Sequence, residues 1–148
     1  MFIDWGGTLA LTKDNRTVID AAGHPVLMPN VVATLARERP RFDVCFIVSN
    51  QARIAKGEID AAEVLRRFAW ANEQLGRPFT AWRLCPHGDE DGCGCRKPRP
   101  GMLLELAGLH DVNLAASTHV GDSAKDRDAA RLAGIATFIW ARDFFNWV

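Results

Sequence analysis

The sequence predicts an α/β fold with a doubly wound, mainly parallel sheet. Segments typical of strands and of helices alternate along the chain, which is the pattern of repeated strand–helix–strand units. The segment Arg41–Val48 ends in a run of apolar residues, as expected for a strand buried on both faces of a parallel sheet. Polar clusters follow three of the predicted strands, at the strand ends where such sheets bind their ligands.

The first half of the chain is expected to contain two strands, a flap and a helix. Gly23 and Pro25 indicate the turn of the flap. Pro29 is suited to the start of a helix, and apolar residues recur beyond it at helical spacing: Val31, Val32, Leu35 and Ala36. The expected elements are a strand at Met1–Asp4, a hairpin flap of Thr17–Ile19 and Val26–Met28, a helix from Pro29 to about Arg39, and the strand Arg41–Val48.

The second half continues the alternation. Gly76 and Gly134 are expected to end two of its helices, because glycine readily adopts the left-handed conformation that follows a helix. The expected elements are a helix at Glu58–Leu75, a strand at Phe79–Leu84, a helix at Pro100–His110, a strand at Ser117–Val120, a helix at Ala124–Ala133 and a strand at Ala136–Trp140. A length of 148 residues suits one domain, so residues 1–148 are expected to share one fold.

The composition is that of an ordinary globular protein, with 48% hydrophobic and 24% charged residues. Eighteen basic and eighteen acidic residues cancel, so no general electrostatic attraction to nucleic acid is expected. No apolar run approaches the ~20 residues that span a bilayer, and the N-terminus lacks the features of a signal peptide. We therefore expect a cytoplasmic protein without a membrane partner. Its oligomeric state is left open, and the short first strand suggests that the natural chain begins further upstream.

Asp4 is the first candidate for chemistry. It directly follows the first predicted strand and precedes Trp5-Gly6-Gly7-Thr8. A carboxylate at this place can be a nucleophile that forms an aspartyl-phosphate, and the glycines allow an anion to approach the backbone. The alternative is an aspartate that only caps a turn.

Asp122 follows the strand Ser117–Val120 and is expected at the same edge of the sheet. Two carboxylates that converge there repel each other and attract a cation. Mg²⁺ is suited to the site, because it takes one or two carboxylates together with waters and phosphate oxygens. Asp126 is either an additional group of this site or a first-turn helix charge stabilised by the helix dipole.

Further polar residues are candidates for binding phosphate. Ser49 can donate to a phosphoryl oxygen, and Asn50 can do so or orient a neighbour. Lys97 offers a point charge, although its basic run, Arg96–Pro100, would by itself be better explained as a solvated loop. Trp5, Arg53 and Lys56 are expected near the rim, where they could contact a substrate.

Cys85, His87, Cys93 and Cys95 form the third candidate site. Three thiolates and one imidazole are a ligand set of closed, tetrahedral structural zinc sites. The loop between His87 and Cys93 has no apolar residue to anchor it, so a metal ion could organise it. The alternative is a set of unliganded thiols. Cys45 is expected to be a small core residue.

Together these motifs resemble the haloacid-dehalogenase (HAD) superfamily of phosphatases. The resemblance rests on the segment Asp4–Leu9, on Ser49-Asn50-Gln51, on Cys85-Pro86-His87 with Cys93–Pro98, and on Gly121-Asp122 with Asp126. It is strongest to the zinc-containing branch without a cap domain, which includes phosphatases of heptose bisphosphate and of histidinol phosphate. It runs from about Ile3 to Ile139 and implies a Rossmann-like fold without a large cap domain.

The resemblance also implies roles for individual residues. Asp4 is expected to be the nucleophile and a Mg²⁺ ligand, with the carbonyl group of Gly6 and the side chain of Asp122 as the other protein ligands. Ser49 and Lys97 are expected to hold the phosphoryl group. Zinc is expected on the Cys85 cluster. The expected phosphate or substrate contacts are Thr8, Ser49, Asn50, Arg53, Arg96 and Lys97.

Gly6 departs from the family pattern, which has at this position an aspartate that acts as general acid and then as general base. Its loss removes a contribution of about 10²–10⁴-fold, so ordinary phosphomonoesters should turn over poorly. His24 in the flap is one candidate replacement, and His87 another unless zinc occupies it. The main hypothesis is a phosphohydrolase for a small phosphorylated metabolite, such as a sugar phosphate. The alternatives are a non-catalytic phosphate-binding protein and a polynucleotide 3′-phosphatase.

Overall fold

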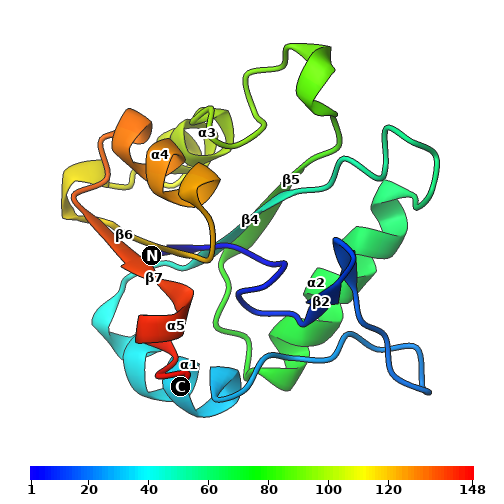
Figure 1. Cartoon of the computed structure of the whole chain (residues 1–148). Coiled ribbons are helices and arrows are strands. Elements are labelled where there is room, and N and C mark those ends of the chain that lie inside the picture. Colours follow the sequence, from blue (N-terminus) through cyan, green and yellow to red (C-terminus); the bar gives the residue numbers. More distant parts are fainter.

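A computed structural model describes all residues, 1–148, and shows a five-stranded parallel sheet. Its strands are β1 (Phe2–Ile3), β4 (Phe46–Asn50), β5 (Ala81–Cys85), β6 (Thr118–Gly121) and β7 (Thr137–Trp140), in the order β5-β4-β1-β6-β7. All four neighbouring pairs are parallel. The short strand β1 lies at the centre, and the chain proceeds from it first to one side and then to the other (Figure 1). The predicted doubly wound α/β fold is therefore confirmed.

Helices cover both faces of this sheet (Figure 1). One face carries α1 (Val31–Glu38), α2 (Ala61–Gln74) and the short α5 (Ala141–Phe144), and the other carries α3 (Gly101–Leu109) and α4 (Ala124–Ala133). Three 3₁₀ turns complete the helical structure: η1 (Arg39–Arg41), η2 (Asp89–Asp91) and η3 (Leu114–Ala116). No helix is both long and apolar enough to cross a membrane.

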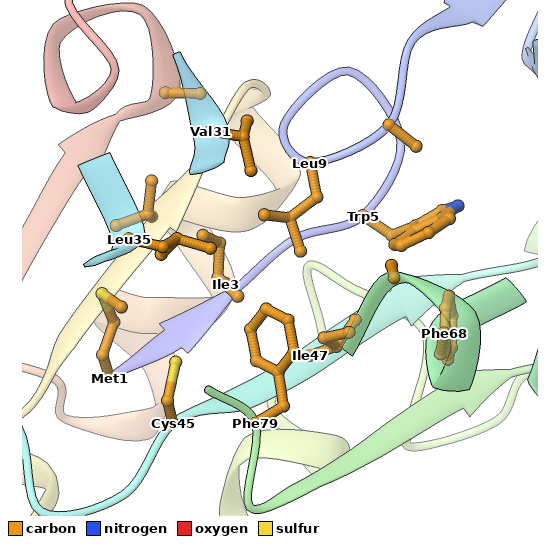
Figure 2. Close-up of a cluster of buried hydrophobic side chains, with 14 of the residues drawn as sticks. Met1, Ile3, Trp5, Leu9, Val31, Leu35, Cys45, Ile47, Phe68 and Phe79 are labelled. Carbon is orange, nitrogen blue, oxygen red and sulfur yellow. The ribbon is translucent and has the colours of Figure 1, made fainter. Parts of the chain in front are cut away.

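Two hydrophobic cores lie on opposite faces of the sheet because neighbouring strand residues point in opposite directions. Ile3 packs in the first core with Trp5, Leu35 and Phe68, as Figure 2 shows. Phe2, the preceding residue, packs in the second core below α3 and α4. Cys45 is fully buried in the first core, as predicted. A strand of two residues therefore connects both halves of the hydrophobic interior.

The regular hairpin of the flap lies closer to the N-terminus than the hairpin expected from the sequence. Its regular hairpin consists of β2 (Thr12–Lys13) and β3 (Arg16–Thr17), which are antiparallel. Asp14 and Asn15 form the turn with φ of 51° and 59°, the left-handed conformation that a two-residue hairpin turn requires. The turn expected at Asp20–Pro25 does form: Ile19 and Pro25 make an antiparallel bridge, and the amide of Val26 donates to the carbonyl oxygen of Val18 at 2.9 Å. The flanking segments Thr17–Ile19 and Val26–Met28 do not form the regular strands expected there, so that part of the prediction is wrong.

Local interactions explain the other shifts of element boundaries. The side chain of Asp60 accepts a hydrogen bond from the Glu63 amide, so α2 begins at Ala61 and not at Glu58. The η1 turn occupies the start of the strand expected at Arg41 and delays β4 to Phe46. Val32 is 57% exposed and Ala36 is also exposed, so the apolar face expected for α1 is wrong at both positions.

Candidate active site

Three strand ends bring the candidate residues to one edge of the sheet. Asp4 follows the central strand β1, Ser49 lies near the end of β4, and Asp122 follows β6. Because β4 and β6 flank β1, this edge is the point where the strand order reverses, and open α/β sheets bind ligands there. Carboxylate oxygens of Asp4, Asp122 and Asp126 lie within 4.8 Å of one another.

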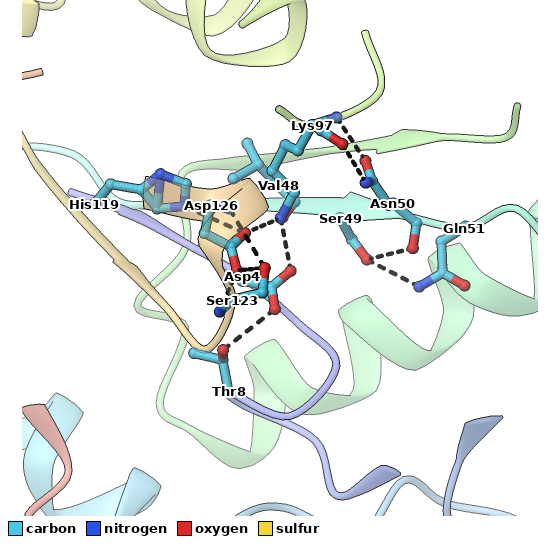
Figure 3. A network of polar contacts seen from close by, with 10 residues as sticks. All are labelled: Asp4, Thr8, Val48, Ser49, Asn50, Gln51, Lys97, His119, Ser123 and Asp126. Carbon is cyan, nitrogen blue, oxygen red and sulfur yellow. Dashed lines mark hydrogen bonds and ion pairs between the residues drawn. The ribbon is translucent and has the colours of Figure 1, made fainter. Parts of the chain in front are cut away.

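Lys97 enters this group from the loop before α3 and is only 2% exposed. Its Nζ donates to Asp4 Oδ1 at 2.7 Å, to Asp126 Oδ1 at 2.6 Å and to the carbonyl oxygen of Val48 at 2.8 Å. Figure 3 shows the ammonium group between the two carboxylates. All three protons of the ammonium therefore have acceptors, and the side chain is held in one position.

The charges of this cluster shift its pKa values. Burial first, and the charge of Asp126 second, raise the pKa of Asp4 to about 7, although Lys97 acts in the opposite direction. Burial alone would lower the pKa of Lys97, but Asp4 and Asp126 outweigh it and hold that pKa above its ordinary value. Three carboxylates and one ammonium leave the cluster with net negative charge, which favours a bound cation.

Asp126 serves both functions that the sequence left open. Its Oδ2 accepts from the Ser123 amide at 3.1 Å while the Asp126 amide donates to Ser123 Oγ at 3.4 Å, which forms a capping box at the start of α4. The same Oδ2 also accepts from the Ser123 hydroxyl group at 2.8 Å. Its other oxygen, Oδ1, accepts a hydrogen bond from Lys97 Nζ. Burial opposes its ionisation, but the charge of Lys97 outweighs burial and keeps the pKa of Asp126 low. Asp126 therefore positions Lys97 and has both of its oxygens engaged.

Asp122 has a different environment and is exposed at the rim. Its carboxylate lies against Gly7, where a Cβ atom would approach Asp122 Oδ2 to 2.2 Å. Gly7 also has a φ of +76°, which side chains rarely tolerate. The Gly-Gly turn therefore allows Asp122 to reach Asp4. The oxygen donors and the excess negative charge fit a hard divalent cation, which Asp4 and Asp122 could hold.

The residues after β4 organise the other side of the site. Ser49 is buried, and its hydroxyl oxygen accepts a hydrogen bond from Gln51 Nε2 at 2.9 Å. Asn50 uses both ends of its amide on the Lys97 backbone: Nδ2 donates to the carbonyl oxygen at 3.0 Å, and Oδ1 accepts from the amide at 2.9 Å. Asn50 therefore orients Lys97, which is one of the two roles considered from the sequence.

These residues lie in an open polar cavity of about 760 Å³. Its volume is within the range of sites for small molecules. Besides Lys97, five basic residues line it: Arg53, Lys56, Arg67, Arg96 and Lys125. Several of them are paired, since Arg53 contacts Glu58 at 2.8 Å and Arg96 contacts Asp89 at 2.7 Å. Lys56 has no acidic partner and is free to meet an anionic ligand.

The four predicted zinc ligands converge at the end of β5. Cys85 Sγ lies 3.0 Å from Cys95 Sγ and 3.6 Å from Cys93 Sγ. His87 Nδ1 lies 3.4 Å from Cys85 Sγ and 3.3 Å from Cys95 Sγ. All three thiols are free. This set of sulfur and imidazole donors fits a tetrahedral metal site with one ion at its centre.

The loop of this cluster also supports the candidate active site. Gly101 donates its amide to the Gly94 carbonyl at 3.0 Å, and a Cβ atom on Gly101 would lie 2.3 Å from that oxygen. The loop thus folds closely onto the start of α3. Arg96 and Lys97 directly follow Cys95, and both line the cavity. The conformation of the cysteine loop therefore helps to position these two cationic side chains.

Some predicted residues have other positions than expected. Thr8 is fully buried and donates to Asp4 Oδ2 at 3.2 Å, so its hydroxyl group contacts the carboxylate and does not line the cavity. Trp5 lines the cavity as expected, but its side chain is buried against Phe68, and its Nε1 donates to Thr17 Oγ1 at 3.1 Å. His24 stacks on Trp70 outside the cavity lining, with ring centroids 4.6 Å apart.

Sequence reasoning missed several residues of this region. His119 on β6 is fully buried, its Nε2 lies 4.0 Å from Asp126 Oδ1, and neither ring nitrogen has a hydrogen-bond partner. Arg67 and Lys125 line the cavity from helices α2 and α4. The sequence carries no local signal for Arg67, since its spacing from Glu63 is that of an ordinary surface pair.

The sequence matches the family model described as Polynucleotide kinase 3 phosphatase over residues 1–140. It is 33% identical to D-glycero-beta-D-manno-heptose-1,7-bisphosphate 7-phosphatase of Bordetella bronchiseptica over 132 residues, which is 87% of this chain and 74% of the relative. The Pseudomonas putida protein of the same name is 38% identical over 128 residues, covering 84% of this chain and 73% of that one.

Comparison with solved structures also finds phosphatases. The crystal structure of D,D-heptose 1,7-bisphosphate phosphatase from B. bronchiseptica, complexed with magnesium and phosphate, superimposes with a TM-score of 0.81 at 31% identity. The match covers 93% of this chain and 77% of that one. A structure from Mesorhizobium loti, described as a HAD-like phosphatase, gives 0.75 at 27% identity, with coverage of 93% and 69%.

Proposed function

Because this chain belongs to the Polynucleotide kinase 3 phosphatase family, within the HAD-type phosphatases, we propose that it is a Mg²⁺-dependent phosphohydrolase that acts through an aspartyl-phosphate on Asp4. The observation that carries the proposal is the contact of Asp4 with Lys97 at the floor of a polar cavity. A buried carboxylate held by a buried ammonium, at the switch point of the sheet, is a suitable nucleophile for phosphorus.

In this proposal each side chain has a part in positioning the phosphoryl group. Lys97 provides a fixed positive charge beside the nucleophile, and Asp126 and the Val48 carbonyl keep that charge in place. Ser49 presents a hydroxyl group on the β4 side. Thr8 donates to the Asp4 oxygen that Lys97 leaves free, which orients the carboxylate. Charge stabilisation and positioning are the main needs of phosphoryl transfer.

Mg²⁺ would be held by Asp4, Asp122 and the backbone carbonyl of Gly6. When bound, it would neutralise the charge that develops on the phosphoryl oxygens and reduce the repulsion between the carboxylates. Zinc would be held by Cys85, His87, Cys93 and Cys95 and would serve structure only, since four protein ligands leave no open position.

The proposed substrate is a small phosphorylated metabolite, and a sugar phosphate such as a heptose bisphosphate is the leading candidate. Two relatives that this chain resembles over most of its length are named for that substrate. The cavity has the size for a sugar with two phosphates, and unpaired Lys56 and partly paired Arg53 could meet a second anionic group. We retain a polynucleotide 3′-phosphate as a second candidate because of the family's description.

The test is phosphate release by the purified chain with Mg²⁺. The panel contains heptose 1,7-bisphosphate, histidinol phosphate, acetyl phosphate, para-nitrophenyl phosphate and a 3′-phosphorylated oligonucleotide. We expect turnover that Asp4→Asn abolishes. Silence of the wild type on every compound would instead support the non-catalytic alternative, in which the site binds Mg²⁺ and phosphate without cleaving an ester.

A further inference from the structure

Position 6 is faced by an apolar group. Gly6 lines the cavity, and the Thr12 methyl carbon, at 3.2 Å, is the only heavy atom outside its immediate neighbours within 4 Å of a Cβ placed there. Thr12 belongs to the flap hairpin, and Gly6 itself bridges to Ala10. The nearest neighbour of a side chain at position 6 would therefore be a methyl group and not a hydrogen-bonding group.

The rest of the cavity provides no evident replacement. Its lining contains no histidine and no cysteine, and the chain has no tyrosine. Outside the Asp4 cluster, the lining carboxylates are all on the η2 turn. Asp89 is paired with Arg96 and Lys125, and Asp91 accepts from the Gly88 amide. Only Glu90 is without a partner, and it is exposed on the loop of the cysteine cluster.

The lack of a proton donor affects the first half of the reaction. An oxygen of Asp4 attacks phosphorus, the bond from phosphorus to the ester oxygen breaks, and the leaving oxygen keeps the electron pair. An alkoxide needs a proton as it leaves. A carboxylate, whose acid has a pKa of about 4, does not, and a phenolate with a pKa of about 10 or lower needs it much less.

The same lack affects the second half. A water oxygen attacks the phosphorus of the aspartyl-phosphate, the bond to Asp4 breaks, and its electron pair returns to the Asp4 carboxylate. The attacking water must lose a proton to solvent or to the phosphate, because no side chain at position 6 accepts it. General base catalysis commonly contributes about 10²–10⁴-fold to such a step.

We propose that this site takes phosphoryl groups from acyl phosphates and other donors with weakly basic leaving groups, and that the phosphoryl group then stays on Asp4 long enough to be isolated. The proposal rests on the phosphohydrolase function proposed above and narrows its substrate class. Among the phosphates of a sugar, it favours one on the more acidic anomeric oxygen over one on a primary alcohol.

The experiment measures kcat/KM with Mg²⁺ for acetyl phosphate, for a series of aryl phosphates of increasing leaving-group pKa, and for an alkyl phosphate. We expect wild-type kcat/KM to fall steeply along the series. Gly6→Asp should raise turnover of the alkyl phosphate about 10²–10⁴-fold and flatten the dependence. Gly6→Asn, of matched size but without a titratable proton, should remain as steep as the wild type.

The second readout is the phosphoenzyme, detected by mass spectrometry after rapid quenching of a reaction with acetyl phosphate. We expect it in the wild type, absent in Asp4→Asn, and shorter-lived in Gly6→Asp. Because an aspartate at position 6 meets the Thr12 methyl group, Gly6→Asp combined with Thr12→Ala provides a variant with more room.

Each contrary outcome has one meaning. Wild-type turnover of the alkyl phosphate at the rate of Gly6→Asp would overturn this inference but leave the phosphohydrolase intact. The inference is equally wrong if kcat/KM falls steeply with leaving-group pKa only in Glu90→Gln and not in the wild type. Glu90 would then be the general acid. Silence of the wild type and of both aspartate variants on every donor would overturn the proposed function itself, and this inference with it.

Discussion

His119 shows how the charges of the site affect a residue that does not reach the cavity. Its imidazole lies between the second core and Asp126, fully buried, with no hydrogen-bond partner on either nitrogen. Burial first, and the charge of Lys97 second, lower the pKa of His119 to about 3. Because the low pKa keeps the His119 ring neutral, Lys97 is the only cation that pairs with Asp126.

We expect this burial to make stability depend on pH. The folded pKa of His119 is below the unfolded value of about 6.5, so only the unfolded chain takes up this proton as the pH falls. The contribution of His119 to the free energy of unfolding should therefore be complete above pH ~6.5 and should decrease below it. For this residue alone, the loss should be about 2 kcal/mol at about pH 5.

Chemical denaturation between about pH 7.5 and about pH 5 measures this effect. His119→Leu should lose less stability than the wild type over the range, by about the stated 2 kcal/mol, because leucine has no proton to take up. His110→Gln, which changes an exposed imidazole, is the control. Parallel curves for wild type and His119→Leu would show that the buried ring does not produce the dependence.

Single residues differ in how well the sequence predicts them. Asp4 and Asp122 could be predicted, because each directly follows a strand and strand ends meet at one edge. The role of Asp126 could not be decided, since a helix cap and a Lys97 partner look alike in sequence. Thr8 was expected to contact the substrate, but the turn after β1 directs its hydroxyl group to Asp4. Trp5 lines the cavity as expected, although its side chain packs in the first core.

At the scale of elements, the cysteine loop is the segment that the proposed zinc ion would stabilise most. Cys93 and Cys95 are only half-buried, and the 3₁₀ turn between them and His87 has no buried residue. Few apolar contacts hold such a loop, so metal binding and local folding are expected to be coupled. The loop leads directly to Lys97, which has no freedom to move without losing its three acceptors.

We expect Cys95→Ser to release the metal. The wild type should contain about one zinc ion per chain by atomic emission, and the variant much less, with a lower melting temperature. Cys45→Ala is the matched control, because Cys45 is also a free thiol but lies in the first core. It should lower stability and leave the zinc content unchanged. Unchanged zinc content in Cys95→Ser would contradict the proposed ligand set.

The flap is the element that sequence reasoning described least well. The turn that Gly23 and Pro25 indicate does form, but the regular hairpin lies around Asp14 and Asn15. Its strands are two residues long, too short for any alternation of polar and apolar residues to be visible. A long-range contact fixes it instead, since Trp5 donates to Thr17 from the turn that carries the nucleophile.

At the scale of the whole molecule, the architecture could be predicted because its signals are repeated. Except for the short α5, the strands and helices that form the sheet and its two layers were expected near their observed positions, and the doubly wound order follows from their alternation. The cavity could not be predicted, because it is lined from α2, η2, α4 and the flap together. Only the folded chain shows which of its cations are paired.

The arrangement of the two cores predicts that the chain unfolds in one step. Phe2 and Ile3 are adjacent in β1 yet belong to different cores, as do Phe46 and Ile47 in β4. Neither core can lose its packing without disturbing strands that the other needs.

We expect one calorimetric transition whose van 't Hoff and calorimetric enthalpies agree, at roughly 100 kcal/mol near 60 °C for 148 residues. A chelator that removes zinc should move this transition to lower temperature as a whole. Two resolved transitions, or a van 't Hoff enthalpy well below the calorimetric one, would mean that the two layers fold independently and that residues 1–148 do not form one domain.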